Sequence, residues 1–252
     1  MPVSPQAWRA AGERRWSRID QALGWIGEQG MYAILDFHSI GFLLDGYYPE
    51  SWYVTSEEGI TEFWRTASSR YASNEVVAFY ELFNEPVTAD KRGAEADWLR
   101  WAAFCEGLVD VIRKNDEHTP IIVGGLDYAY DLSHVLAHPL DRPSIVYATH
   151  VYPQRQREGW DRYFGDIAER FPVFCTELGF DSRYPQYAEE TLFGQRGRYR
   201  RELIEYLEER GISWTVWSFA VQWGPGLLEG WDYTPNEAGA FYRQQLLSHQ
   251  GR

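Results

Sequence analysis

The fold of this chain is decided by the stretch Phe79-Tyr80-Glu81-Leu82-Phe83-Asn84-Glu85-Pro86. A run of apolar and aromatic side chains ends there in a polar pair, and a proline follows at once. Such a run is typical of a buried β-strand, and the proline cannot donate to a strand ladder. Because an amide and a carboxylate are costly to bury, Asn84 and Glu85 are candidate site residues.

A second stretch, Phe174-Cys175-Thr176-Glu177-Leu178-Gly179, repeats this pattern later in the chain. Glu177 also follows a short apolar run, so a second glutamate is expected at the end of another strand. A pair of carboxylic acids is what many enzymes use to cleave a bond between two sugars. The two stretches together therefore predict a two-carboxylate site.

The composition of the chain limits its class. Its 252 residues suit one α/β domain of the (β/α)8 barrel size. The formal net charge of −13 disfavours nucleic acid and anionic membranes as partners and suits a neutral substrate. The chain holds 12 Trp, 17 Tyr and 13 Phe, so some rings are expected in the core and others in a groove that stacks on sugars.

The two cysteines and the apolar segments indicate little beyond a globular protein. Cys105 and Cys175 lack metal-ligand spacing and are expected to be free thiols. No apolar run approaches the ~18 residues of a membrane span. The first thirty residues show no apolar signal-peptide core, and the location of the protein is left open.

Periodicity predicts an alternation of strands and helices. Helices are expected over residues 16–26, 60–72, 95–114, 130–138, 160–170, 191–209 and 237–247. Strands are expected over 32–38, 76–85, 121–125, 144–152 and 212–217, and another follows Pro172 and ends at Glu177. This order indicates βαβ units and a parallel sheet of about six strands, where a closed barrel needs eight. Neither a repeat nor a linker divides the chain, so residues 1–252 are predicted to form a single domain.

Polar or aromatic residues stand at the carboxyl ends of five predicted strands: His38, Asn84 with Glu85, His150 with Tyr152, Glu177, and Trp217. In an α/β barrel that face carries the active site, because the βα loops meet there. A single histidine at a strand end is more often a structural residue. Five such ends together favour one binding pocket.

The sequence resembles glycoside hydrolase family 5, the cellulases and mannanases with a retaining mechanism and a (β/α)8 barrel. The resemblance rests on the segments 35–38 (Leu-Asp-Phe-His), 84–86 (Asn-Glu-Pro), 150–152 (His-Val-Tyr), 176–179 (Thr-Glu-Leu-Gly) and 214–217 (Trp-Thr-Val-Trp), in that order.

This resemblance implies a role for each residue of the set. Glu85 would be the general acid/base and Glu177 the nucleophile, while Asn84 would hold the 2-hydroxyl of the sugar. The remaining residues would orient the carboxylates and bind the sugar: His38, His150, Tyr152 and Trp217. The resemblance implies neither a metal ion nor an organic cofactor.

The chain departs from the family at its N-terminal end. Family members have two strands before the one that ends in His38, and the second of these ends in an arginine beside the nucleophile. Residues before Trp16 do not supply these strands, so we expect an incomplete barrel and a lower rate. An open parallel sheet exposes its edges, and we therefore expect a homo-oligomer that covers them.

Five aromatic residues in predicted loops are candidates for further sugar subsites. They are Trp52, Tyr128, Trp160, Trp223 and Trp231. For each of them packing in the core or against a loop is an equally good interpretation.

The sequence therefore predicts a retaining endo-β-glycosidase that acts on a β-1,4-linked polysaccharide, with cellulose-type glucan first and mannan second. A weakened or inactive carbohydrate-binding remnant of the same fold stays open as an alternative. So does an enzyme on β-1,3-glucan or a glycoconjugate, because these would differ in loop shape rather than in catalytic residues.

Overall fold

A computed structural model describes residues 1–91 and 93–249 of the chain. The chain divides into two compact units, Met1–Ala148 and Thr149–Arg252. The single domain expected over residues 1–252 stays a prediction.

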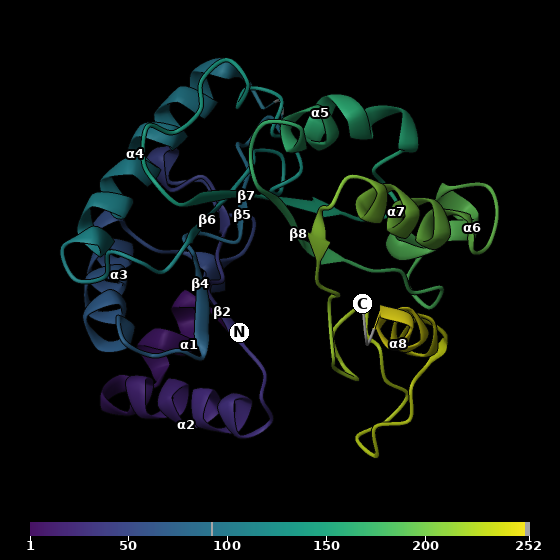
Figure 1. Ribbon diagram of the computed structural model, residues 1–252, viewed down its shortest axis with the longest axis horizontal. Helices are drawn as coiled ribbons and strands as arrows, with labels where there is room; N and C mark the ends of the chain where they lie inside the picture. Colours follow the sequence, from purple (N-terminus) through teal and green to yellow (C-terminus); the bar gives the residue numbers. More distant parts are fainter. Residues whose placement is uncertain (92, 250–252) are drawn as a thin grey trace. The chain divides into compact units, whose positions relative to one another are not determined.

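The first unit is built on a parallel sheet in the order β1-β2-β4-β6-β7 (Figure 1). These strands are β1 (Pro2–Val3), β2 (Ala33–Phe37), β4 (Val77–Glu81), β6 (Ile121–Gly124) and β7 (Ile145–Val151). A separate parallel pair follows β2 and β4, formed by β3 (Ile40–Gly41) and β5 (Glu85–Pro86). The opening stretch of the sequence thus supplies β4, a short break, and then β5.

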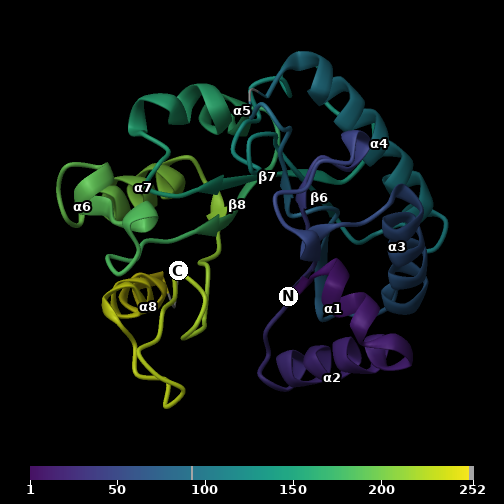
Figure 2. The same ribbon diagram turned by 180° about the vertical axis from the view of Figure 1, so that it is seen from behind.

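Helices α1 (Pro5–Ala10), α2 (Arg15–Glu28), α3 (Glu57–Tyr71) and α4 (Glu95–Arg113) complete the first unit (Figures 1 and 2). Helix α3 begins where the Ser56 hydroxyl accepts a hydrogen bond from Gly59 N–H at 3.1 Å, as an N-cap serine should. Two indole N–H groups attach helices to the strand ends. Trp64 of α3 donates to Leu82 O at 3.0 Å, and Trp101 of α4 donates to Gly124 O at 3.1 Å. These bonds fix the backbone near the candidate site.

In the second unit the strand order is β7-β8-β9, with β8 at Val173–Leu178 and β9 at Ser213–Trp214. Its helices are α5 (Asp166–Ala168), α6 (Glu189–Leu192), α7 (Arg198–Glu209) and α8 (Glu237–His249). Figure 2 shows α6 next to α7, and the two helices are in contact. Tyr199 and Leu203 of α7 are fully buried, so this helix contributes much of the core.

The main sheet contains seven strands among the described residues, one more than the six expected. The additional strand is β1, whose Pro2 and Val3 lie in parallel register with Asp36 and Phe37 of β2. Residues before Trp16 therefore supply one short strand, where none was expected, and the expected incomplete barrel is confirmed with seven strands instead of six. Two residues are too short a run for periodicity to reveal.

Three predicted helices differ from the structure for local reasons. The helix expected over 191–209 is split into α6 and α7, because Gly194 and Gly197 between them have φ of 73° and 78°. Residues 130–138 form turns, and Asp131 accepts a hydrogen bond from Ser133 N–H at 2.8 Å, which competes with a helical bond. The helix expected over 160–170 begins as a π-helical turn, Asp161–Gly165, before α5.

Two further properties follow from the described residues. Cys105 and Cys175 are both buried free thiols, as expected from their spacing. Within residues 1–91 and 93–249, the helices fall short of the length and apolar character required to cross a membrane.

Candidate active site

In the first unit, Asn84 and Glu85 lie just beyond the carboxyl end of β4. Asn84 N–H donates to Phe37 O at 3.2 Å and Glu85 N–H donates to Ser39 O at 3.0 Å. The polar pair is therefore fixed against the end of β2 through its backbone. The residues are buried, with Asn84 2% and Glu85 8% exposed.

His38 lies at the end of β2, between the two residues whose carbonyls hold Asn84 and Glu85. Its Nδ1 is 2.8 Å from Asp36 Oδ2, and both side chains are largely buried. The His38 ring lies 6.5 Å from the ring of Tyr53, and Tyr53 contacts Trp52 edge-on at 5.8 Å. Trp52 is 42% exposed, so the loop after β2 carries an accessible ring next to Tyr53.

Tyr128 lies in a turn of unusual backbone conformation after β6. Asp127, Tyr128 and Ala129 have φ of 53°, 62° and 58°, which is the left-handed region that side chains with a Cβ disfavour. Tyr128 N–H donates to Pro86 O at 3.1 Å, so this turn is attached directly behind Glu85. Lys91 Nζ lies 5.1 Å from the ring centroid of Tyr128, and the hydrogen bond with the Tyr128 side chain raises the pKa of Lys91. Backbone strain like that of residues 127–129 is typical of functional sites.

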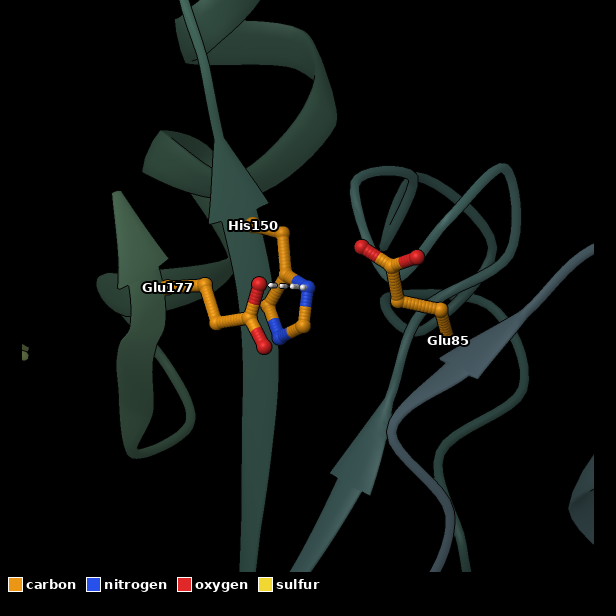
Figure 3. A group of neighbouring side chains, drawn as sticks. All are labelled: Glu85, His150 and Glu177. Atoms are coloured by element: carbon orange, nitrogen blue, oxygen red, sulfur yellow. Dashed lines mark ion pairs between the residues drawn. The ribbon is translucent and has the colours of Figure 1, made fainter. Parts of the chain in front are cut away.

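In the second unit, Glu177 near the end of β8 is the centre of a polar cluster. The Tyr152 hydroxyl donates to Glu177 Oε2 at 2.6 Å, and His150 Nδ1 lies 3.6 Å from the same oxygen. Figure 3 draws His150 and Glu177 with this ion pair as a dashed line, together with Glu85. A short hydrogen bond from a phenol stabilises and orients an ionised carboxylate.

His150 is fixed on its other side as well. Its Nε2 lies 3.0 Å from Thr176 Oγ1, and the His150 ring is almost completely buried. His150 and Tyr152 are two residues apart at the end of β7, so their side chains share one face of the strand. The second unit therefore brings together three of its four residues assigned by resemblance, namely His150, Tyr152 and Glu177.

The fourth residue, Trp217, is attached by its backbone to the strand that carries Glu177. Its N–H donates to Leu178 O at 2.9 Å, and its side chain is half-buried. Trp223 and Trp231 in the following loop are 64% and 61% exposed, so their rings are accessible to a ligand.

The prediction that Trp160 contributes a subsite was wrong. Its side chain is 0% exposed, its ring packs on Phe193 and Tyr206, and its indole N–H donates to Arg155 O at 2.9 Å. A tryptophan in a helical segment fills the core when its N–H has an internal acceptor.

The structure adds two aspartates to which the sequence assigned no role. Asp36 contacts His38, and the signal for it was its position two residues before His38 on one strand. Asp181 follows β8 and accepts hydrogen bonds from Arg183 Nε at 2.9 Å and from Gly226 N–H at 3.3 Å. It thereby joins the loop after Glu177 to the loop after Trp217, a link that sequence spacing does not reveal.

Comparison with known proteins places this chain among the glycoside hydrolases. The chain matches the cellulase family, glycosyl hydrolase family 5, over residues 2–222, and it belongs to this family. The resemblance seen in the sequence is thus confirmed. The fold class, an α/β fold of the (β/α)8-barrel type with fewer than eight strands, is also confirmed.

Individual relatives agree with this assignment. A β-glucanase from Saccharophagus degradans is similar with a TM-score of 0.90 and 35% identity, over 98% of this chain and 77% of that one. Its structure in complex with cellotetraose gives a TM-score of 0.91. An endoglucanase from Thermobifida fusca is 27% identical over 84% of this chain and 42% of its own length. An endoglucanase from Streptomyces lividans is 24% identical over 91% and 49%. The chain thus spans less than half the length of these two curated relatives.

Proposed function

We propose that this protein is a retaining endo-β-glycosidase that hydrolyses β-1,4-glucan. The observation that carries the proposal is the Glu177 carboxylate held by the Tyr152 hydroxyl at 2.6 Å, with His150 alongside. Glu85, buried beside Asn84 at the end of another strand, supplies the second carboxyl that the chemistry requires. Membership of the cellulase family supports the reaction class.

The proposed reaction is a double displacement. The Glu177 carboxylate attacks C1 of the sugar, while the Glu85 carboxylic acid gives its proton to the departing glycosidic oxygen. Glu85, now ionised, then takes a proton from water, whose oxygen attacks C1 and releases Glu177. This mechanism requires the two carboxyls to lie ~5–5.5 Å apart in the working site. A hydrogen bond from Asn84 to the 2-hydroxyl would strengthen in the transition state.

The names of the relatives guide the choice of substrate. Curated relatives are endoglucanases, and the similar β-glucanase has been solved with cellotetraose. We therefore place cellulose-type glucan first and mannan second. The proposed binding residues are His38, His150, Tyr152 and Trp217, with Trp52, Tyr128, Trp223 and Trp231 as outer subsites.

The roles of the two glutamates can be separated with two substrates. On soluble β-1,4-glucan, Glu85→Gln and Glu177→Gln should each lose nearly all activity. On an aryl β-cellobioside whose leaving group needs no proton, Glu85→Gln should retain formation of the glycosyl-enzyme and release a burst of phenol. Glu177→Gln should be inactive on both substrates, because it has lost the nucleophile.

Exposed glutamates supply the controls for this experiment. Glu75→Gln in the first unit and Glu169→Gln in the second should behave like the unchanged protein on both substrates. If Glu85→Gln lost the same fraction of activity on both substrates, the role of Glu85 as the acid would be refuted. A first product with the α anomeric configuration would refute retention. Binding of cellotetraose without release of reducing sugar would favour the non-catalytic alternative.

A further inference from the structure

The carboxyl of Asp36 is unusual among the buried carboxyls of the first unit. Its Oδ2 lies 2.8 Å from His38 Nδ1, but its Oδ1 is buried and has no hydrogen-bond partner. Its register partner on β4 is Glu81, another buried acid, so two acidic side chains neighbour one another across the strands. An unpartnered buried oxygen and an adjacent acid both lower stability.

Asp116 shows how a purely structural aspartate is built in the same unit. It is 2% exposed and accepts hydrogen bonds from the Tyr80 and Thr119 hydroxyls and from the His118 and Thr119 N–H groups. Both of its oxygens are used. Asp36 does not have hydrogen-bond donors for both of its oxygens. A stabilising role therefore does not explain why Asp36 is buried.

The contact with His38 gives Asp36 a chemical task. A carboxylate can only accept hydrogen bonds, so the tautomer that matches a carboxylate at this 2.8 Å contact carries its proton on His38 Nδ1. The ring orientation is then fixed, with Nε2 on the opposite edge. His38 stands between Phe37 and Ser39, whose carbonyls accept hydrogen bonds from the backbones of Asn84 and Glu85.

We propose that Asp36 is a positioning residue that fixes the tautomer and orientation of the His38 ring at the sugar-binding site. It acts through His38 and does not itself contact the substrate. The kinetic part of this inference rests on the proposed glycosidase activity, whereas the structural part does not. A buried carboxyl oxygen without a hydrogen bond lowers the stability of the protein. What Asp36 provides in return is a fixed orientation of a functional side chain.

The decisive variants are Asp36→Leu, which removes the acceptor and fills the space, and Asp36→Asn, which keeps a carbonyl acceptor without the charge. For Asp36→Leu we expect a melting temperature equal to or above that of the unchanged protein. We also expect a fall in kcat on soluble β-1,4-glucan of about 10- to 100-fold, because a misplaced binding group costs this much in rate. For Asp36→Asn, kcat should lie between the values of Asp36→Leu and of the unchanged protein. The control Asp116→Leu should lower the melting temperature sharply.

A spectroscopic measurement tests the tautomer without any activity. In ¹⁵N–¹H spectra of the neutral imidazoles, the His38 signals, assigned by their loss in His38→Gln, should show a protonated Nδ1. In Asp36→Leu they should change towards a mixture of tautomers, while in Asp116→Asn they should stay as they are. An unchanged His38 spectrum in Asp36→Leu would overturn the proposal, whether or not the protein hydrolyses glucan. If the spectrum changes in a protein without activity, the proposed function fails and the role of Asp36 stands.

Discussion

At the scale of a single residue, the Tyr152 hydroxyl donates a hydrogen bond to the proposed nucleophile, at 2.6 Å from Glu177 Oε2. Tyr152→Phe removes this donor and keeps the ring. Because a hydrogen bond to a charged group contributes about 1.5–3 kcal/mol, we expect kcat to fall about 10- to 100-fold. Steady-state kinetics on soluble β-1,4-glucan measure this fall.

The control for Tyr152→Phe is Tyr233→Phe in the same unit. Tyr233 is 64% exposed and stacks on Phe219, so the same chemical change there should leave kcat unchanged. If Tyr152→Phe were as active as Tyr233→Phe, the hydrogen bond to Glu177 would have no catalytic importance.

The charge of Asp116 should make the stability of the protein depend on pH. Burial raises the pKa of Asp116, but hydrogen bonds from Thr119, His118 and Tyr80 outweigh burial and hold this pKa below its usual value. A carboxyl whose pKa is lowered by folding stabilises the protein above its unfolded pKa of about 3.9. That stabilisation is lost as the pH falls through the folded pKa.

Unfolding in urea at a series of pH values tests this linkage. The unchanged protein should exceed Asp116→Asn in free energy of unfolding at pH 7, and the difference should shrink as the pH falls below about 4. A difference that stays constant over this range would show that the charge of Asp116 contributes nothing.

At the scale of an element, the turn at residues 127–129 stores backbone strain close to Glu85. Non-glycine residues in the left-handed region cost about 1–2 kcal/mol each. Tyr128→Gly and Tyr128→Ala both remove the ring, but only glycine removes the strain. We therefore expect Tyr128→Gly to be more stable than Tyr128→Ala by about 1 kcal/mol, the reverse of the usual order. Thermal unfolding of the two variants tests this order, and a more stable alanine variant would contradict it.

The helices and strands differ in how much of their structure the sequence predicts. Alternating strands and helices with polar strand ends were visible because burial imposes a period on the sequence. The split between α6 and α7 and the left-handed turn depend on backbone φ values, which periodicity does not report. The contacts of Glu177 with Tyr152 and His150 join different strands. The strand ends indicated a shared pocket, but only the family resemblance assigned a role to each residue. Trp160 was misjudged because exposed and buried tryptophans look alike in a sequence.

At the scale of the whole molecule, the open edge of the sheet in the first unit bears on association. Strand β1 pairs with β2 on one side and is the first strand in the order of the sheet. Because an edge strand offers unpaired backbone groups, we expect a dimer or larger oligomer of the 29.4 kDa chain. Sedimentation equilibrium over a range of concentrations measures the mass, and a stable 29.4 kDa species that does not aggregate would contradict this expectation.

The two cysteines provide a way to follow how the molecule opens. Cys105 belongs to the first unit and Cys175 to the second, and burial raises the pKa of both thiols. Since alkylating reagents attack the exposed thiolate, each sulfur reacts only when its surroundings transiently unfold. The ratio of the two labelling rates therefore reports whether the units unfold together or one before the other. The chain carries one natural probe of local unfolding in each half.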